Sequence, residues 1–209
     1  MAAPTCDIIF AGGGTAACVT AGRLAAAHPS LKILLVEAGP HTRDLQEHVQ
    51  PARYMSNLFP GSKVFTFHAA QPSEHVGGRS IVVPVGKCVG GGSSVNFAMY
   101  TRAVASDYDD WERVYGNTGW GSKDMIPLLN KAETFQISDG THDAHGRTGP
   151  IKVSYGGLFT NTAEDFLATA AGFDETRDLT KDVNSFHQCN AYGKWPKCDT
   201  DSKWVRGAD

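Results

Sequence analysis

The first 36 residues constrain the fold most strongly, because two apolar runs flank one glycine-rich turn and one alanine-rich segment. Residues 6–10 form a short apolar run, and residues 15–27 carry alanine and leucine at helical spacing. Pro29 and Ser30 break this pattern, and residues 31–36 are again apolar. The order predicts a strand, a helix and a second strand, which is the βαβ unit of a parallel sheet and therefore an α/β fold.

The turn between the first strand and the helix has the spacing of a dinucleotide-binding loop. Gly12 permits a tight turn, Gly14 lets the backbone approach a pyrophosphate, and Ala17 is the third small residue, where helix and strand pack. Glu37 follows the second strand, where a carboxylate accepts hydrogen bonds from ribose hydroxyls and repels a 2′-phosphate. The predicted contacts are Gly12, Gly14, Thr15, Ala16, Ala17, Glu37 and Ala38. The motif does not separate FAD from NAD, since both carry an ADP half, and a glycine turn without a ligand is the alternative.

The composition excludes several classes of function. A net charge of -3 without a run of like charges argues against a nucleic-acid partner. The sequence has neither a signal-peptide pattern nor an apolar run long enough to cross a bilayer, so we expect an intracellular protein without a membrane partner. Five cysteines without a closely spaced pair predict reduced thiols, and we expect no metal site.

A second glycine-rich stretch, residues 86–100, decides between the cofactors. It runs from Gly86 and Lys87 through three consecutive glycines and two serines to Asn96 and Tyr100. This pattern resembles the first signature of the glucose/methanol/choline (GMC) oxidoreductase family, and the resemblance implies a stretch that lies along the flavin ring of FAD. It adds Gly90, Gly91, Ser94, Asn96 and Met99 to the expected FAD contacts. No histidine lies between Arg79 and Val89, so the flavin is expected to be bound without a covalent link.

The resemblance also implies an architecture and an activity. It implies a Rossmann-like FAD-binding domain over residues 1–150 and the start of an α+β substrate domain over 151–209. Within the family it is greatest to fungal alcohol (methanol) oxidases, which implies oxidation of a short primary alcohol by oxygen to an aldehyde and hydrogen peroxide. The catalytic histidines of the family come from a late signature, so no catalytic residue is expected in these 209 residues, which look like an N-terminal fragment.

Other functions and locations remain open. The alternatives are a GMC dehydrogenase, a flavin-bearing lyase, or an inactive, truncated flavin-binding protein. An alcohol and oxygen are the implied partners, the whole protein could form a homo-oligomer, and the compartment is the cytoplasm or the peroxisome. A parallel sheet without its later strands would expose an edge and an apolar face, so the chain as given is expected to aggregate.

The remaining sequence predicts scaffold elements. Strands are expected at 63–69, 80–85 and 151–154, and helices after Gly121 and at 162–171. Residues 106–109 resemble a helix capping box. His142 and His145 are spaced like metal ligands, but their glycine-rich surroundings favour a solvated loop.

Overall fold

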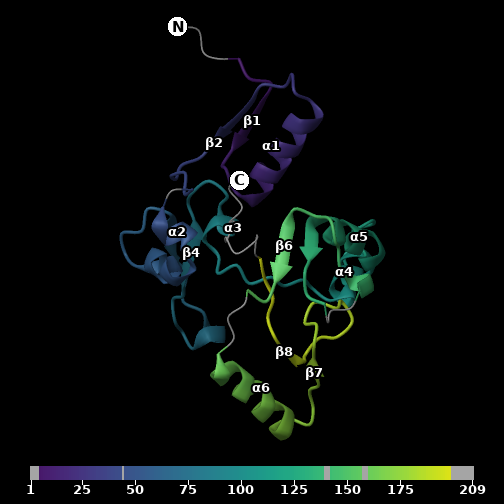
Figure 1. Ribbon diagram of the computed structural model, residues 1–209. Coiled ribbons are helices and arrows are strands. Elements are labelled where there is room, and N and C mark those ends of the chain that lie inside the picture. Colours follow the sequence, from purple (N-terminus) through teal and green to yellow (C-terminus); the bar gives the residue numbers. More distant parts are fainter. Residues whose placement is uncertain (1–4, 44, 139–141, 157–159, 199–209) are drawn as a thin grey trace. The chain divides into compact units, whose positions relative to one another are not determined.

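A computed structural model describes residues 5–43, 45–138, 142–156 and 160–198. The chain divides into two compact units, and the division falls between Phe97 and Ala98. The domain boundary expected at residue 150 lies inside the second of these units, and the division into two domains at that residue stays a prediction. Each unit is described by itself (Figure 1).

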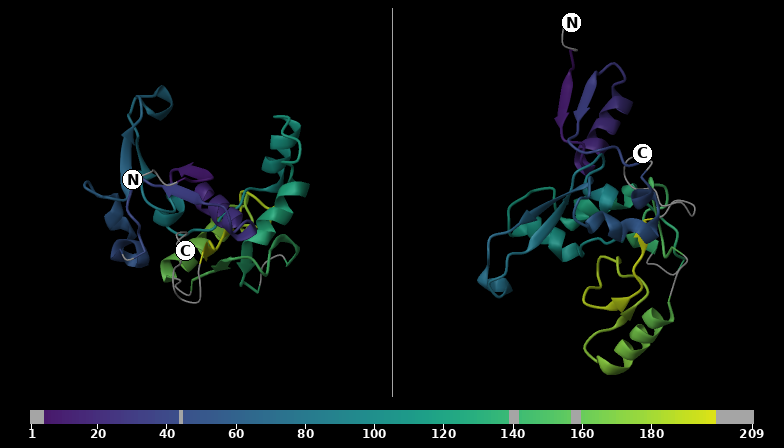
Figure 2. Two further views of the ribbon diagram at one scale, coloured as in Figure 1. Left: turned by 90° about the horizontal axis from the view of Figure 1, so that it is seen from above. Right: turned by 90° about the vertical axis from the view of Figure 1, so that its left-hand side faces the viewer.

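The first unit begins with the expected βαβ arrangement. Strands β1 (Ile8–Ala11) and β2 (Ile33–Val36) pair in parallel, with Ile8 opposite Ile33 and Ala11 opposite Val36. Helix α1 (Thr15–Ala27) connects them and runs beside the two strands in Figure 1 and in the right-hand view of Figure 2. The strand, helix and strand predicted from the sequence are confirmed, and each strand starts two residues later than expected.

The rest of the first unit is an antiparallel pair with short helices around it. Strands β3 (Phe65–Ala69) and β4 (Val82–Gly86) pair over their whole length, so both strands expected here are confirmed. The sequence did not predict α2 (Gln46–Val49), α3 (Gly92–Val95) or the 3₁₀ segments Pro51–Leu58 and Glu74–Val76. A small core of Val64, Cys88 and Val95, with Leu45 and Phe65 against it, joins these segments.

The second unit combines helices with short strands. Helices α4 (Ala105–Arg113), α5 (Ser122–Ala132) and α6 (Asn161–Phe173) include the two expected after Gly121 and at 162–171. Strands β5 (Glu133–Phe135), β6 (Ile151–Ser154) and β9 (Lys197–Cys198) form one sheet, and β7 (Leu179–Thr180) pairs with β8 (Tyr192–Gly193). The residues His142–Ala144 form a 3₁₀ turn.

Helix starts differ from the sequence expectation at one place. The capping box expected at residues 106–109 is wrong, because α4 begins after Val104 and no side chain caps it. Asp109 instead accepts a hydrogen bond from the backbone N–H of Ser122 at 3.0 Å, so it caps the following helix, α5. Helix α6 has a side-chain cap of its own, since the Thr160 hydroxyl oxygen accepts from the Ala163 N–H.

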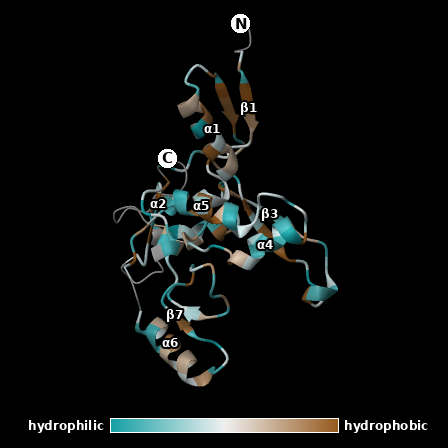
Figure 3. Cartoon of the chain, turned by 90° about the vertical axis from the view of Figure 1, so that its right-hand side faces the viewer, coloured by the Kyte–Doolittle hydropathy of each residue, from teal (hydrophilic) through white to brown (hydrophobic). Residues whose placement is uncertain are grey.

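One face of the β1–β2 sheet is apolar and exposed. Ile9 and Leu34 lie opposite each other in the register, and their exposed fractions are 63% and 40%. Val36, on the same face, is 52% exposed. Figure 3 shows β1 in the brown of hydrophobic residues. Within the part of the chain that the structure describes, no helix is both long and apolar enough to cross a membrane.

The exposed sheet face leads to a prediction about the 209-residue chain. We expect it to self-associate and to bind a hydrophobic dye, because a contiguous apolar surface and an unpaired strand edge favour association. Ile9→Thr keeps a β-branched side chain and should reduce self-association. Sedimentation velocity and dye fluorescence measure both effects. A monomeric chain without dye binding would contradict this expectation.

Candidate functional site

The first glycine loop forms a sharp connection between β1 and α1. Gly12 has a φ of 104°, which favours glycine, and its N–H donates to the Val36 carbonyl oxygen at 2.7 Å. Gly13 is buried, and a Cβ there would lie 2.7 Å from Leu35 Cδ2, so this glycine allows the close packing between loop and strand. The sequence analysis assigned that packing role to Ala17, which stays a prediction, and the structure shows it for Gly13.

Gly14 is different, because no contact with the described residues requires glycine there. Its φ of -71° suits any residue, and a Cβ would meet no described atom within 4 Å. It is the N-cap of α1 and supplies no side-chain hydrogen bond to the first turn. Thr15 and Ala16 in that turn are exposed, and no acidic residue occupies it. The start of α1 therefore presents backbone N–H groups and the positive end of the helix dipole to an anion.

Glu37 ties the end of β2 to the first glycine loop. Its Oε2 accepts from the Gly13 N–H at 2.7 Å, and its Oε1 accepts from the Gly39 N–H at 2.8 Å. These bonds lower the pKa of the Glu37 carboxyl. Their contribution to stability is present at neutral pH and is lost as the pH falls through the lowered pKa. A hydrogen bond from the Ala38 N–H also lowers this pKa. A carboxylate offers about four acceptor positions, so Glu37 can still accept a further hydrogen bond. Ala38 beside it is exposed.

The second glycine loop binds directly to the first. The Gly90 N–H donates to the Gly13 carbonyl oxygen at 2.7 Å. The Thr15 hydroxyl donates to the Gly90 carbonyl oxygen at 3.2 Å and lies 2.8 Å from the Ser93 hydroxyl. Two segments that are distant in sequence thus meet through their backbones, and the sequence analysis did not predict this contact.

Three further glycines allow the two loops, and the turn after Glu37, to pack closely against one another. A Cβ at Gly91 would lie 2.9 Å from the Gly14 Cα, and a Cβ at Gly86 would lie 2.8 Å from the Gly91 carbonyl carbon. A Cβ at Gly39 would lie only 1.8 Å from the Lys87 carbonyl oxygen. The turn after Glu37 is therefore packed against the second loop as closely as the first loop is.

The remaining predicted contacts have different surroundings. Ser94 is fully buried, and its hydroxyl donates to the Val89 carbonyl oxygen at 2.7 Å, so its side chain stabilises the loop. Asn96, in the first unit, and Met99, in the second, are exposed. Contacts of these three residues with a cofactor stay predictions.

Sequence reasoning missed a buried polar cluster in the second unit. His145 was expected in a solvated loop, but it is 6% exposed and contacts Glu133, Asp182 and Arg102. These partners are separated from one another by up to 80 positions, so no local spacing marks them. The side chain of His142 lies outside the described residues. Among the side chains that the structure does describe, no group of three or more His, Cys, Asp or Glu has a metal-binding arrangement.

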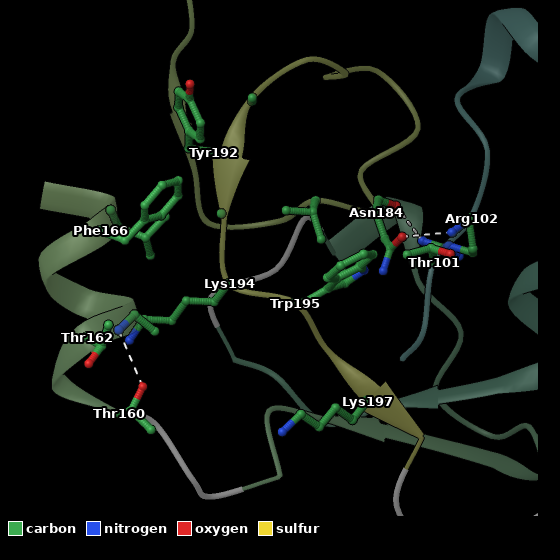
Figure 4. A pocket seen from close by; sticks show the side chains of 15 residues that line it. Thr101, Arg102, Thr160, Thr162, Phe166, Asn184, Tyr192, Lys194, Trp195 and Lys197 are labelled. Atoms are coloured by element: carbon green, nitrogen blue, oxygen red, sulfur yellow. Dashed lines mark hydrogen bonds between the residues drawn. The ribbon is translucent and has the colours of Figure 1, made fainter. Parts of the chain in front are cut away.

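The second unit also contains a cavity of about 940 Å³ between α6 and residues 191–197. Figure 4 shows Phe166 projecting from α6 toward Tyr192, and their rings meet edge to face at 6.0 Å. Trp195 and Lys194 lie on the segment across the cavity from α6. None of the predicted cofactor contacts lines it.

Comparisons with known proteins show the family of this chain. A family model described as GMC oxidoreductase matches residues 6–207. The chain is 42% identical to an alcohol oxidase of Candida boidinii over 191 residues, which are 90% of this chain and 28% of that protein. It is 34% identical to an alcohol dehydrogenase [acceptor] of Pseudomonas putida over 87% of this chain and 32% of that one. The chain thus spans about a third or less of these two relatives.

A solved structure has the same fold. Pyridoxine 4-oxidase from Mesorbium loti superposes with a TM-score of 0.78 at 24% identity, over 98% of this chain and 39% of that one. At this identity the likeness shows the fold alone.

The contact between the two glycine loops can be tested with neighbouring glycines. Gly91 has φ 54° and ψ -132°, a conformation outside the regions allowed to other residues, and its Cβ would strike Gly14. Gly91→Ala should therefore lower the free energy of unfolding by about 1–3 kcal/mol. Gly92→Ala is the control, because its Cβ would meet no described atom within 4 Å. Urea denaturation compares them, and equal stability of the two variants would contradict the close approach.

Proposed function

Because the chain belongs to the GMC oxidoreductase family, with a match over residues 6–207, we propose that it forms the FAD-binding part of an oxidoreductase acting on CH–OH groups. The observation that carries this proposal is the direct bonding of the two glycine loops through Gly13 and Gly90. It brings the loop with dinucleotide spacing and the loop with the GMC signature to one place in the first unit.

The residues of the first loop fit the ADP half of FAD. A pyrophosphate would lie at the start of α1, where no contact with the described part of the chain requires glycine at position 14. The small side chains of Thr15, Ala16 and Ala17 leave the N–H groups of the first turn accessible to phosphate oxygens. Gly12 supports the turn that directs the helix start at the phosphates.

Glu37 is the proposed ribose contact. The N–H groups of Gly13 and Gly39 fix its carboxylate, and its remaining acceptor capacity is available to the ribose. Its negative charge disfavours a 2′-phosphate, and the exposed Ala38 next to it leaves room for the adenosine.

The second loop is the proposed flavin contact. Gly90 and Gly91 give this loop a backbone without side chains beside the first loop. We assign the flavin contacts to these glycines and to Ser94, Asn96 and Met99, with Ser94 acting by holding the loop in shape. Residues 1–150 and 151–209 are the proposed FAD-binding and substrate domains.

Bound FAD would supply the acceptor for a hydride from the alcohol carbon. The residues of this chain bind and orient the cofactor, and we assign none of them as the base for the hydroxyl proton. A short primary alcohol is the proposed substrate and oxygen the proposed electron acceptor, since the identity is 42% to an alcohol oxidase against 34% to an alcohol dehydrogenase [acceptor]. The homo-oligomer and the cytoplasmic or peroxisomal location stay predictions from the sequence.

The proposed electron acceptor, oxygen, can be tested on the whole protein of which this chain is a part. We expect methanol or ethanol to bleach the flavin absorbance without oxygen, and admitted oxygen to restore it with formation of hydrogen peroxide. Bleaching followed by slow reoxidation would favour a dehydrogenase. A flavin that no alcohol reduces would contradict oxidation of CH–OH groups.

Glu37 gives the sharpest test of FAD binding. Glu37→Arg removes the hydrogen-bond acceptor for the ribose and introduces a cation. FAD should therefore bind more weakly by about 1.5–3 kcal/mol, the range for a hydrogen bond to a charged group. Glu37→Gln keeps the shape and should lose less. Glu74→Gln, on an exposed 3₁₀ turn, is the control for loss of a carboxylate. Titration of the FAD-free protein gives each dissociation constant, and equal values for Glu37→Arg and the control would contradict the assignment.

A further inference from the structure

Four ionisable side chains meet in the interior of the second unit. Arg102 Nη1 lies 2.9 Å from Glu133 Oε1, and the exposed fractions of these side chains are 2% and 0%. His145 and Asp182 complete the cluster, with side chains 0% and 5% exposed. Phe135 stacks on the His145 ring, so the cluster is closed by an aromatic face.

Each ring nitrogen of His145 faces a carboxylate. Nδ1 lies 2.9 Å from Glu133 Oε1, and Nε2 lies 2.9 Å from Asp182 Oδ2. A neutral imidazole has one N–H and one lone pair, so it can donate to only one of the two oxygens. The doubly protonated ring can donate to both.

We propose that His145 is a buried imidazolium and that its two ring N–H groups stabilise the second unit by donating to both carboxylates. The unit therefore loses stability when one of these ring protons is released at rising pH. The charge count supports this assignment. With the imidazolium, the two cations Arg102 and His145 balance the two anions Glu133 and Asp182. With a neutral ring, the interior would hold one uncompensated negative charge, which is costly at low dielectric.

Arg102 offers the competing arrangement. Its Nη2 lies 3.0 Å from His145 Nδ1 and could donate to the lone pair of a neutral ring. Nη2 carries two N–H groups, and one of them donates to the Asn184 carbonyl oxygen at 2.6 Å, so the other could reach Nδ1. A neutral ring in that arrangement would, however, set its Nδ1 lone pair against Glu133 Oε1, 2.9 Å away. The contacts therefore favour the imidazolium.

The direction of the pH effect follows from the surroundings. Burial by itself lowers the pKa of His145, and Arg102 does so too, but the bonds to Asp182 and Glu133 outweigh both, so the pKa is raised above its ordinary 6.5. The stabilisation is complete below the unfolded-state pKa and is lost as the pH rises toward the raised pKa of the folded state. In this interval the unfolding equilibrium constant should grow by up to about tenfold per pH unit.

We assign fixed charges in this interval to the other charged and titratable groups around the ring. Binding to His145 and Arg102 lowers the pKa of Glu133 despite its burial, so it titrates at acidic pH. Burial and Glu133 raise the pKa of Tyr100. Burial lowers the pKa of Arg102, but an arginine remains charged at neutral pH. Asp182 Oδ1 accepts from the Asn184 N–H at 2.9 Å, which favours its anionic form.

The hydrogen bonds of this buried cluster join three parts of the second unit. The Arg102 N–H donates to Asn184 Oδ1 at 2.8 Å, and Asn184 Nδ2 donates to the Tyr100 carbonyl oxygen at 3.0 Å. Glu133 begins β5, and its Oε1 also accepts from the Gly146 N–H at 3.0 Å. Loss of the proton should loosen all of these segments together. The inference concerns stability and does not depend on FAD binding.

Thermal unfolding between pH 6 and pH 9 tests the proposal. The melting temperature of the unaltered protein should fall over this range. Asp182→Asn removes one anion, so a neutral ring then balances the charges. This variant should be less stable at pH 6 and approach the unaltered protein at pH 9. His145→Gln should have little pH dependence, and His75→Gln, at an exposed position, should behave like the unaltered protein. A pH-independent melting temperature, or the same fall in His145→Gln, would overturn the proposal.

A second measurement uses the unaltered protein, so it does not depend on whether a variant folds. Exchange of the histidine C2 hydrogen, followed by mass spectrometry at a series of pH values, gives the pKa of each histidine in the unaltered protein. We expect His145 to stay protonated above the ordinary histidine pKa of 6.5. A His145 that is already neutral at pH 7 would show that Arg102 donates to the ring and would overturn the imidazolium.

Discussion

The hydrogen bond from the Gly90 N–H to the Gly13 carbonyl oxygen is the contact on which the candidate site depends. It joins two loops that the chain separates by strands β2, β3 and β4. Thr15 and Ser93 add a hydroxyl contact beside it. A backbone bond of this kind requires both loops to approach without intervening side chains, which is why glycine recurs on both sides of the contact.

The glycines of the two motifs therefore serve different purposes. Gly13, Gly39 and Gly91 are needed for packing within the chain, because a Cβ at any of them would strike neighbouring atoms. At Gly14 the space is open, and we propose that a bound pyrophosphate fills it. In the proposed function Glu37 combines both purposes, since it binds the Gly13 N–H of the first loop and the Gly39 N–H of the following turn and would also accept from the ribose. In this proposal, the residues that hold the two loops together are also those that would bind the cofactor.

Local patterns predicted the parts of the fold that local forces determine. The βαβ unit over residues 6–36 and the strands at 63–69 and 80–85 follow from apolar periodicity, and the structure has them. The capping box at 106–109 was wrong because Asp109 bonds to the next helix. The environment of His145 could not be predicted from the sequence. A histidine in a glycine-rich segment is expected to be solvated, and only the fold brings Glu133 and Asp182 into contact with its ring. The second glycine loop was recognised by its resemblance to a family, whereas its bond to the first loop needed the structure.

The central claim is that the two glycine loops hold each other through bonds within the chain. Amide hydrogen exchange of Gly90 in FAD-free protein tests it most directly, because this N–H donates to the Gly13 carbonyl oxygen. The Gly13 N–H, which donates to Glu37, is followed beside it and reports whether the first loop itself is folded. We expect both amides to exchange slowly without FAD and to change little when FAD is added. Exchange at the rate of an unstructured chain, with protection only after FAD is added, would show that the cofactor and not the chain joins the loops.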